Sequence, residues 1–273
     1  YKEVLDGLPK DMIVMYWKYN TKEKHPLIEK IKDFKLPFIV SPSIIDYNRI
    51  FPSFVRSEKN MTNLIKNGFK NGAMGEITSS WGDYKNKEIR ENRFYGFIFS
   101  SQVGWNPIKK VNIIHYWKSL ITHFFGIYDD RLFKVIKILR SIEVDKRLHT
   151  RPTFYYNHFF SHPYNKKSSS YRKNLKTSKF ESVIKDMHEV ITLCKDLETK
   201  VLRNKENLLN FAFVAKHIKF YCKKRINSKK LADFSPKRAK KAYKLQIIRE
   251  LENLIKDLTS LLEEYELLWM SVA

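Results

Sequence analysis

The sequence predicts an α/β fold for residues 1–110 and an all-α region for residues 111–273. In the first part, three short apolar runs alternate with helical patterns. After residue 110 the apolar residues recur at spacings of three and four, which is typical of amphipathic helices. Alternating strands and helices indicate parallel strands joined by right-handed crossovers, with helices covering the sheet.

The predicted strands cover residues 12–17, 38–41 and 74–79. Each is a short apolar run that ends in polar or small residues. A helix that begins at Pro26 follows the first strand, because proline is favoured at the first helical position. A short helix over residues 60–68 follows the second strand, and a helix from about 87 to 104 follows the third. The predicted order is therefore β-α-β-α-β-α.

Aromatic and polar residues follow the carboxyl end of each predicted strand. Successive parallel strands direct these loops to one rim, where α/β proteins assemble their active sites. An aromatic ring can cover the C–H face of a pyranose, while a carboxylate accepts hydrogen bonds from its hydroxyls. We therefore expect a sugar-binding site made of Trp17, Tyr19, Asp46, Tyr47, Asn48, Trp81 and Asp83.

The net charge of +23 arises from 52 basic and 29 acidic residues. Most of the basic residues are lysines spread along the whole chain, and the densest clusters, 223–225, 229–230 and 237–241, lie around one predicted helix connection. A solvated connection explains them, so we do not expect a nucleic-acid partner. The alternative function is a non-catalytic basic helical protein that binds nucleic acid or another anionic partner.

No run of apolar residues has the length of about 20 that a membrane span needs, so no membrane association is expected. Cys194 and Cys222 lie far apart in helical patterns, which argues against a disulfide framework and favours a cytoplasmic protein. His115 and His123 share a predicted helix face, but no third ligand accompanies them. We expect neither a metal site nor a cofactor.

Beyond residue 110, a helix is predicted over residues 113–126, with Gly126 as its stop. Two further amphipathic patterns cover 180–201 and 208–222. A third long helix starts at Ser235-Pro236, which resembles an N-cap followed by proline. Together the last three helices predict an antiparallel bundle. The apolar core of the third would be Ile248, Leu251, Ile255, Leu258, Leu262, Tyr265 and Trp269.

The first part of the chain resembles the glycoside hydrolase family 20 β-N-acetylhexosaminidases. The segments 12–17, 38–48 and 72–83 are similar to the sixth, seventh and eighth strands of that family's (β/α)₈ barrel. Gly72-Ala73-Met74-Gly75 through Trp81-Gly82-Asp83 carries the most specific part of the resemblance. The closing helix departs from the family pattern, because Ser101-Gln102 stands where Ala-Glu is usual.

The resemblance implies the C-terminal portion of a TIM barrel, with about three parallel βα units, followed by a helical domain. It also implies hydrolysis of terminal β-linked N-acetylhexosamine by substrate-assisted catalysis. The family's Asp-Glu acid pair belongs to the fourth strand, which corresponds to none of the segments in this chain. We therefore expect pocket walls but no catalytic residue here, with the acid pair upstream of residue 1 and the missing N-terminal barrel half as a partner. A homodimer is also considered.

Overall fold

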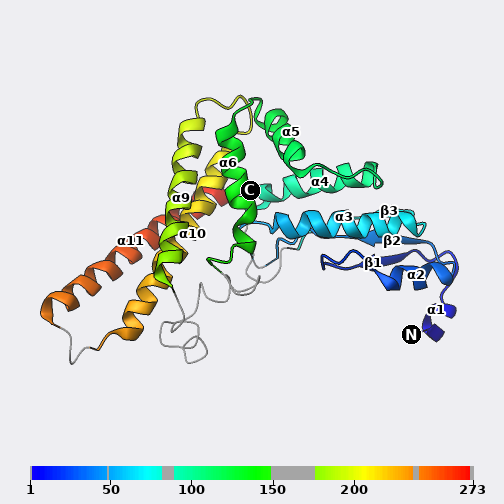
Figure 1. Cartoon of the computed structure of the whole chain (residues 1–273), viewed down its shortest axis with the longest axis horizontal. Helices are drawn as coiled ribbons and strands as arrows, with labels where there is room; N and C mark the ends of the chain where they lie inside the picture. The colour runs from blue at the N-terminus through cyan, green and yellow to red at the C-terminus, as the bar shows by residue number, and fades with distance from the viewer. Residues whose placement is uncertain (1, 48, 82–88, 149–175, 236–239, 271–273) are drawn as a thin grey trace. The chain divides into compact units, whose positions relative to one another are not determined.

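The computed structural model describes residues 2–47, 49–81, 89–148, 176–235 and 240–270. The chain forms two compact units, Tyr1–Leu120 and Ile121–Ala273. The first contains the strands, and the second is built from helices (Figure 1). The division falls inside a helix, ten residues beyond the boundary at 110 expected from the sequence.

The first unit follows the predicted alternation of strands and helices. The sequence did not reveal α1 at its start, and residues 90–93 of the helix predicted over about 87–104 form a 3₁₀ turn, η1, ahead of α4. In chain order the elements are α1 (Lys2–Asp6), β1 (Val14–Trp17), α2 (Pro26–Asp33), β2 (Phe38–Ser41), α3 (Phe54–Lys70), β3 (Gly75–Glu76), η1 (Arg90–Arg93), α4 (Phe94–Trp105) and the start of α5 (Ile113–Phe125).

The three strands form a parallel sheet in the order β1-β2-β3, which confirms the predicted topology. Val14 pairs with Phe38 and Trp17 with Ser41, while Ile39 pairs with Gly75. The third strand is shorter than the predicted 74–79, because regular pairing ends at Glu76. Beyond the ends of β2 and β3, an isolated parallel bridge still joins Ser43 to Ser79.

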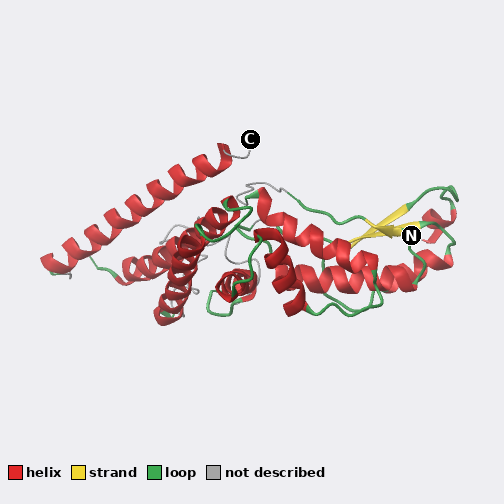
Figure 2. Ribbon diagram, turned by 90° about the horizontal axis from the view of Figure 1, so that it is seen from above, coloured by secondary structure: helices red, strands yellow, loops and turns green. Residues whose placement is uncertain are grey.

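Helices cover one face of this sheet (Figure 2). Tyr16, Val40 and Glu76 are in register across the three strands, so their side chains share that face. The hydroxyl of Tyr16 contacts His25 at the start of α2, and Ser100 of α4 donates a hydrogen bond to Glu76. Val40 is fully buried against α3.

The opposite face of the sheet is apolar and open. Met15 and Trp17 of β1 are exposed, and Ile77, just after β3, has 52% of its surface accessible. Alternation along the strands places these side chains away from the helices. A sheet face of this composition is ordinarily covered by other parts of a protein.

The second unit contains the end of α5 together with α6 (Asp130–Ser141), η2 (Ile142–Val144), α9 (Thr177–Leu197), α10 (Glu206–Asp233) and α11 (Lys241–Met270). Helix α5 ends before Gly126, whose φ of 74° suits the predicted C-terminal stop. The sequence analysis did not identify α6. The predicted start of the third long helix at Pro236 lies outside the described residues.

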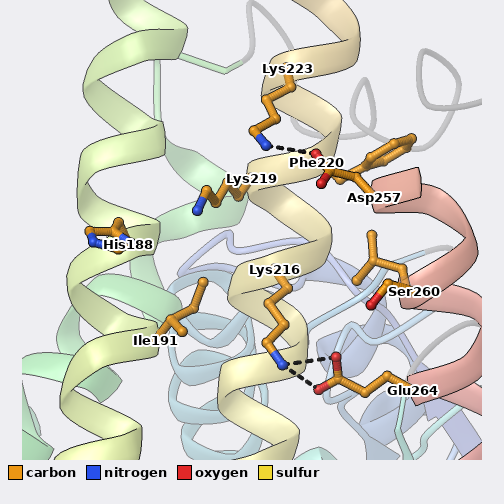
Figure 3. A pocket seen from close by; sticks show the side chains of 10 residues that line it. His188, Ile191, Lys216, Lys219, Phe220, Lys223, Asp257, Ser260 and Glu264 are labelled. Carbon is orange, nitrogen blue, oxygen red and sulfur yellow. Dashed lines mark hydrogen bonds and ion pairs between the residues drawn. The ribbon is translucent and has the colours of Figure 1, made fainter. Parts of the chain in front are cut away.

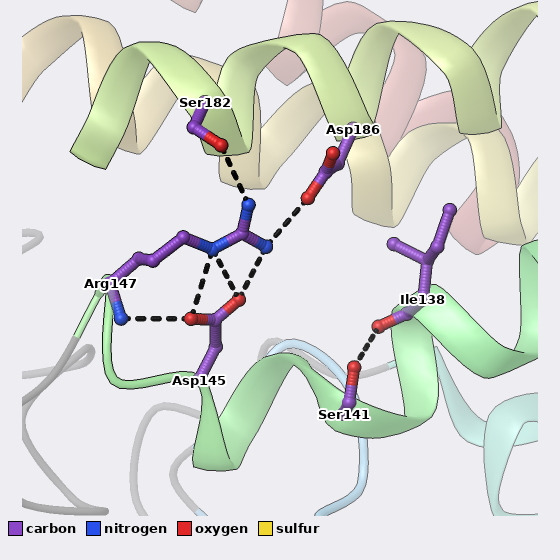
Figure 4. Close-up of polar contacts among 6 residues, drawn as sticks. All are labelled: Ile138, Ser141, Asp145, Arg147, Ser182 and Asp186. Carbon is purple, nitrogen blue, oxygen red and sulfur yellow. Dashed lines mark hydrogen bonds and ion pairs between the residues drawn. The ribbon is translucent and has the colours of Figure 1, made fainter. Parts of the chain in front are cut away.

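Helix α10 is the central element of the second unit, because α9 and α11 both pack on it. Its buried residues include Phe211, Ala215 and Ile218, which belong to the apolar pattern expected from the sequence. Arg147 lies between Asp145, Ser182 and Asp186 and ties the segment after η2 to α9 (Figure 4).

Three ion pairs spaced by seven residues join α10 to α11. Lys216 pairs with Glu264 at 2.8 Å, and Lys223 pairs with Asp257 at 2.6 Å (Figure 3). Lys230 pairs with Glu250 at 2.9 Å. The two helices are therefore antiparallel, as predicted.

The prediction that the apolar stripe of α11 is an ordinary core is wrong. Within that stripe Ile248, Ile255 and Leu262 are 50%, 64% and 56% exposed. The two buried residues of the helix, Ile247 and Leu261, lie one position before Ile248 and Leu262. Because α10 covers the side of α11 that carries Ile247 and Leu261, the adjacent stripe stays open.

The contact between α3 and β2 depends on a glycine. A Cβ atom at Gly68 would lie 2.7 and 2.9 Å from the two Cγ atoms of Val40, which cannot rotate away in a filled core. Gly68→Ala should therefore lower the free energy of unfolding by about 1–3 kcal/mol in urea titrations. The matched control is Gly104→Ala on α4, where the nearest atom is at 3.5 Å. Equal stability of the two variants would contradict this packing.

Candidate functional site

The aromatic residues predicted for the site come together around Tyr19. The rings of Trp17 and Tyr19 have centroids 5.5 Å apart, and those of Tyr19 and Tyr47 are 6.2 Å apart. The indole Nε1 of Trp81 donates a 2.6 Å hydrogen bond to the hydroxyl of Tyr19. We name Trp17, Tyr19, Tyr47 and Trp81 the aromatic rim. Its members follow three different strands, yet they meet at one end of the sheet.

The aromatic rim offers apolar surface to solvent. Trp17 is 62% exposed and Trp81 is 47% exposed, while Tyr19 and Tyr47 are half-buried between them. Tyr19 holds the rim together, because its hydroxyl accepts hydrogen bonds from the indole of Trp81 and, at 2.9 Å, from Ser79. Two exposed indoles held by hydrogen-bonded neighbours form a surface that a flat apolar ligand face can contact.

Asp46, predicted to contact a sugar, is buried and fully engaged by the protein. Its Oδ1 accepts a 3.1 Å hydrogen bond from the backbone N–H of Trp81. Its Oδ2 accepts a hydrogen bond from the hydroxyl of Ser80 and forms a 3.1 Å ion pair with Nε of Arg93. The geometry gives this carboxylate the role of fixing the loop that carries Trp81, instead of facing a ligand.

One side chain of α3 joins the loops that follow β1 and β2. The amide of Asn60 donates to the carbonyls of Lys18 and Asn20 at 2.7 and 2.6 Å. Its Oδ1 accepts a 3.0 Å hydrogen bond from the N–H of Ser43. Asn60 is completely buried, so these bonds are shielded from competing water. This amide therefore fixes the position of Tyr19 relative to the segment that carries Tyr47.

The loop after β2 also contains a residue in an uncommon backbone conformation. Ile45 has a φ of 55°, which is rare for a β-branched residue. The hydroxyl of Ser43 accepts a hydrogen bond from the Ile45 N–H at 3.0 Å, and the hydroxyl of Ser57 donates to the Ile44 carbonyl. Strain of this kind persists only where surrounding contacts enforce it, and it is concentrated at functional sites.

A buried histidine lies at the start of α2, beside the site. Nδ1 of His25 lies 3.4 Å from the Tyr16 hydroxyl, and the tautomer of the imidazole determines which of the two groups is the donor. Burial lowers the pKa of His25, and the positive charges of Lys18 and Lys22 lower it further. Burial also raises the pKa of Tyr16. Both groups are therefore neutral near pH 7, and they bring no charge to the sheet end.

Two predicted site residues, Asn48 and Asp83, lie outside the described residues. Sequence reasoning missed Arg93 and Asn60, which hold the site together. Arg93 lies within the helix predicted over about 87–104 and gives no signal of its partner 47 positions away. Asn60 was assigned to the start of a helix, where a polar residue is ordinary. Among the described residues, no group of three or more histidine, cysteine, aspartate or glutamate side chains could hold a metal ion.

No protein-family model matches this chain, and no curated protein is similar to it in sequence. None of the helices in the described part of the chain is both long and apolar enough to cross a membrane.

The ion pair between Asp46 and Arg93 should make a large contribution to the stability of the first unit. Removing one member of a buried pair costs about 3–5 kcal/mol, because the other charge stays buried. Asp46→Asn should therefore lower the free energy of unfolding by about 3 kcal/mol in urea titrations. Replacing both residues, as Asp46→Asn with Arg93→Met, should recover part of that loss.

The control for this prediction is Asp11→Asn, which changes an exposed carboxylate and should alter stability by less than about 0.5 kcal/mol. If Asp46→Asn were equally mild, the carboxylate would not be holding the Trp81 loop.

Proposed function

We propose that this chain is part of a glycoside hydrolase that removes terminal β-linked N-acetylhexosamine, and that the aromatic rim is a wall of its sugar pocket. The observation that carries the proposal is the meeting of two exposed indoles, Trp17 and Trp81, on Tyr19 at the carboxyl end of parallel strands. Carbohydrate rings present C–H faces that stack on such surfaces.

Exposed aromatic surface alone does not determine ligand specificity. The hydrogen bonds that hold Trp81, however, favour a rigid binding site. Trp81 is fixed at its backbone by Asp46 and at its indole by Tyr19. Holding a side chain in place before binding removes entropic cost from the association. The rings could therefore orient a pyranose and exclude water from one of its faces.

The open apolar face of the sheet supports the proposal that the three strands belong to a larger barrel. Among the described residues, β1 and β3 each pair with β2 alone, so each has an unpaired edge. Met15 lies on the face opposite the helices, where a closed barrel would have its packed interior. We propose that further strands, from the missing N-terminal barrel half, pair with β1 and cover this face.

The proposed reaction is substrate-assisted, with the 2-acetamido oxygen attacking the anomeric carbon while a protein acid protonates the leaving oxygen. Asp46 is not available for that role, because both of its carboxylate oxygens are already bonded to other protein groups. This chain would then supply binding and orientation, and the acid pair would lie upstream of residue 1.

The alternative function, binding of nucleic acid or another anion by the helical region, has less support. A groove of about 320 Å³ between α9, α10 and α11 is lined by Lys216, Lys219 and Lys223 (Figure 3). Glu264 and Asp257 already neutralise the first and third of these lysines. That leaves Lys219 as the single lysine of the groove without an ion pair in the part of the chain that the structure describes.

Binding of N-acetylglucosamine should shift the indole N–H signals of Trp17 and Trp81 in ¹H–¹⁵N spectra. Trp81→Ala should weaken binding about tenfold, since an aromatic contact contributes about 0.5–1.5 kcal/mol beyond its buried area. Trp105→Ala is the matched control, because Trp105 is 92% exposed at the end of α4. Equal affinities of the two variants, or shifts at Trp105 alone, would remove the support for this pocket.

The chain by itself should not hydrolyse an aryl N-acetyl-β-glucosaminide. Loss of a general acid usually costs about 10²–10⁴ in rate, and loss of the residue that orients the acetamido group costs more. A polypeptide extended upstream through the acid pair should hydrolyse the substrate, with kcat/KM lowered by Trp81→Ala. Turnover by the 273-residue chain would show that its acid lies within this sequence.

A further inference from the structure

The exposed stripe of α11 follows a strict seven-residue repeat. Ile248, Ile255, Leu262 and Trp269 are seven positions apart, and Leu251, Leu258 and Tyr265 form a second series three positions further on. This is the a/d pattern of a coiled coil, sustained over three heptads. At 1.5 Å per residue, the stripe from Ile248 to Trp269 is about 32 Å long.

Helix α10 covers only part of this stripe, where Phe213 of α10 stacks on Tyr265 with ring centroids 5.8 Å apart. The acids Glu250, Asp257 and Glu264, which pair with α10, lie on a different row of α11. The first series of the stripe remains 50%, 64%, 56% and 39% exposed at its four members. A continuous apolar row of this kind on a 30-residue helix indicates a helical partner.

The charges beside the stripe indicate which partner fits. The first half of α11 is basic, because Glu250 is already paired with α10 and Glu252 is its other acid. Its basic residues are Lys241, Lys244, Arg249 and Lys256. The second half, residues 257–270, contains no basic residue, and its acids not tied to α10 are Glu263 and Glu266. None of these seven side chains has an ion-pair partner among the described residues. The helix is thus basic along one half and acidic along the other.

We propose that α11 pairs antiparallel with α11 of a second copy of this chain. In the register that places Ile255 opposite Leu258 of the second copy, Leu251 lies opposite Leu262 and Ile248 opposite Tyr265. Three positions of the first series thus meet one of the second, while Trp269 lies opposite Lys244. The arrangement is the same when seen from either copy, as a two-fold interface requires.

The same register brings opposite charges together. Arg249 of one copy lies at the same height along the axis as Glu263 and Glu266 of the other, and the two-fold axis repeats this arrangement at the far end. Parallel pairing would instead place the basic halves side by side, which is unfavourable. The two copies of α10 stay on the outside, so the assembly is a four-helix bundle made of two helical hairpins.

The first test is the mass of the full chain as a function of concentration, measured by sedimentation equilibrium. The wild-type chain should form dimers, and Ile255→Glu should weaken association at least about a hundredfold because it places two charges in the apolar seam. Leu267→Glu is the matched control, since Leu267 is 72% exposed on the same helix but outside the stripe. A monomeric wild-type chain, or equal effects of the two variants, would overturn the proposal.

The second test separates the two orientations. A spin label on Lys244→Cys should report a distance of about 37 Å across an antiparallel pair, because position 244 then lies opposite position 269. Parallel pairing would bring the two labels within about 15 Å and would overturn the antiparallel arrangement. The native thiols do not interfere, because Cys194 and Cys222 are buried and burial raises the pKa of Cys194 to about 12.

The role of the charges can be tested by reversing those of the basic half in one variant and those of the acidic half in another. A variant with Arg249→Glu and Lys256→Glu, and another with Glu263→Lys and Glu266→Lys, should each self-associate about tenfold more weakly than the wild type. An equimolar mixture should restore wild-type association through a mixed dimer. Failure of the mixture to associate better than either variant would contradict the role assigned to these charges.

Discussion

The buried amide of Asn60 is the contact on which the candidate site depends. It binds the carbonyls of Lys18 and Asn20 and the N–H of Ser43, so one side chain of α3 joins two loops at the sheet end. Parallel pairing alone brings strand ends to the same edge, but it does not fix loop conformation. Without this amide the buried N–H of Ser43 and the part-buried carbonyls of Lys18 and Asn20 would each lose a hydrogen bond, which is costly.

Asp46 plays the same part for the third loop. Its two oxygens hold Ser80, the backbone of Trp81 and Arg93, which connects the loop after β3 to the turn before α4. The polar groups therefore determine the positions of the rings, while the rings themselves remain available to a ligand. This division of roles explains why an acid expected to bind sugar is buried beneath the aromatic rim.

The sequence predicts β2 with its observed ends and α5 to within one residue, because both have clean apolar patterns and clear boundaries. It predicts only residues 60–68 of α3, which begins at Phe54. The first turns of α3 bury Ser57 and Glu58, and Glu58 accepts a 2.8 Å hydrogen bond from the indole of Trp117. Polar residues on a buried face break the apolar period, so that part of the helix is hidden from a pattern search.

For the site, the sequence predicts which aromatic residues meet, since strand ends determine their neighbourhood. It does not predict the ion pair between Asp46 and Arg93, because the pairing of charges that are distant in sequence depends on tertiary geometry. Likewise, the stripe of α11 shows which face is apolar, but not whether another helix covers it. Residue patterns define surfaces, whereas their partners are determined by how elements pack.

The central claim is that a sugar ring lies against Trp17 and Trp81. Intermolecular nuclear Overhauser effects in the presence of N-acetylglucosamine test it most directly. We expect contacts between protons on one face of the pyranose and the indole protons of these two residues. Contacts confined to Trp105 or to the helices of the second unit, or no contacts at saturating sugar, would contradict it.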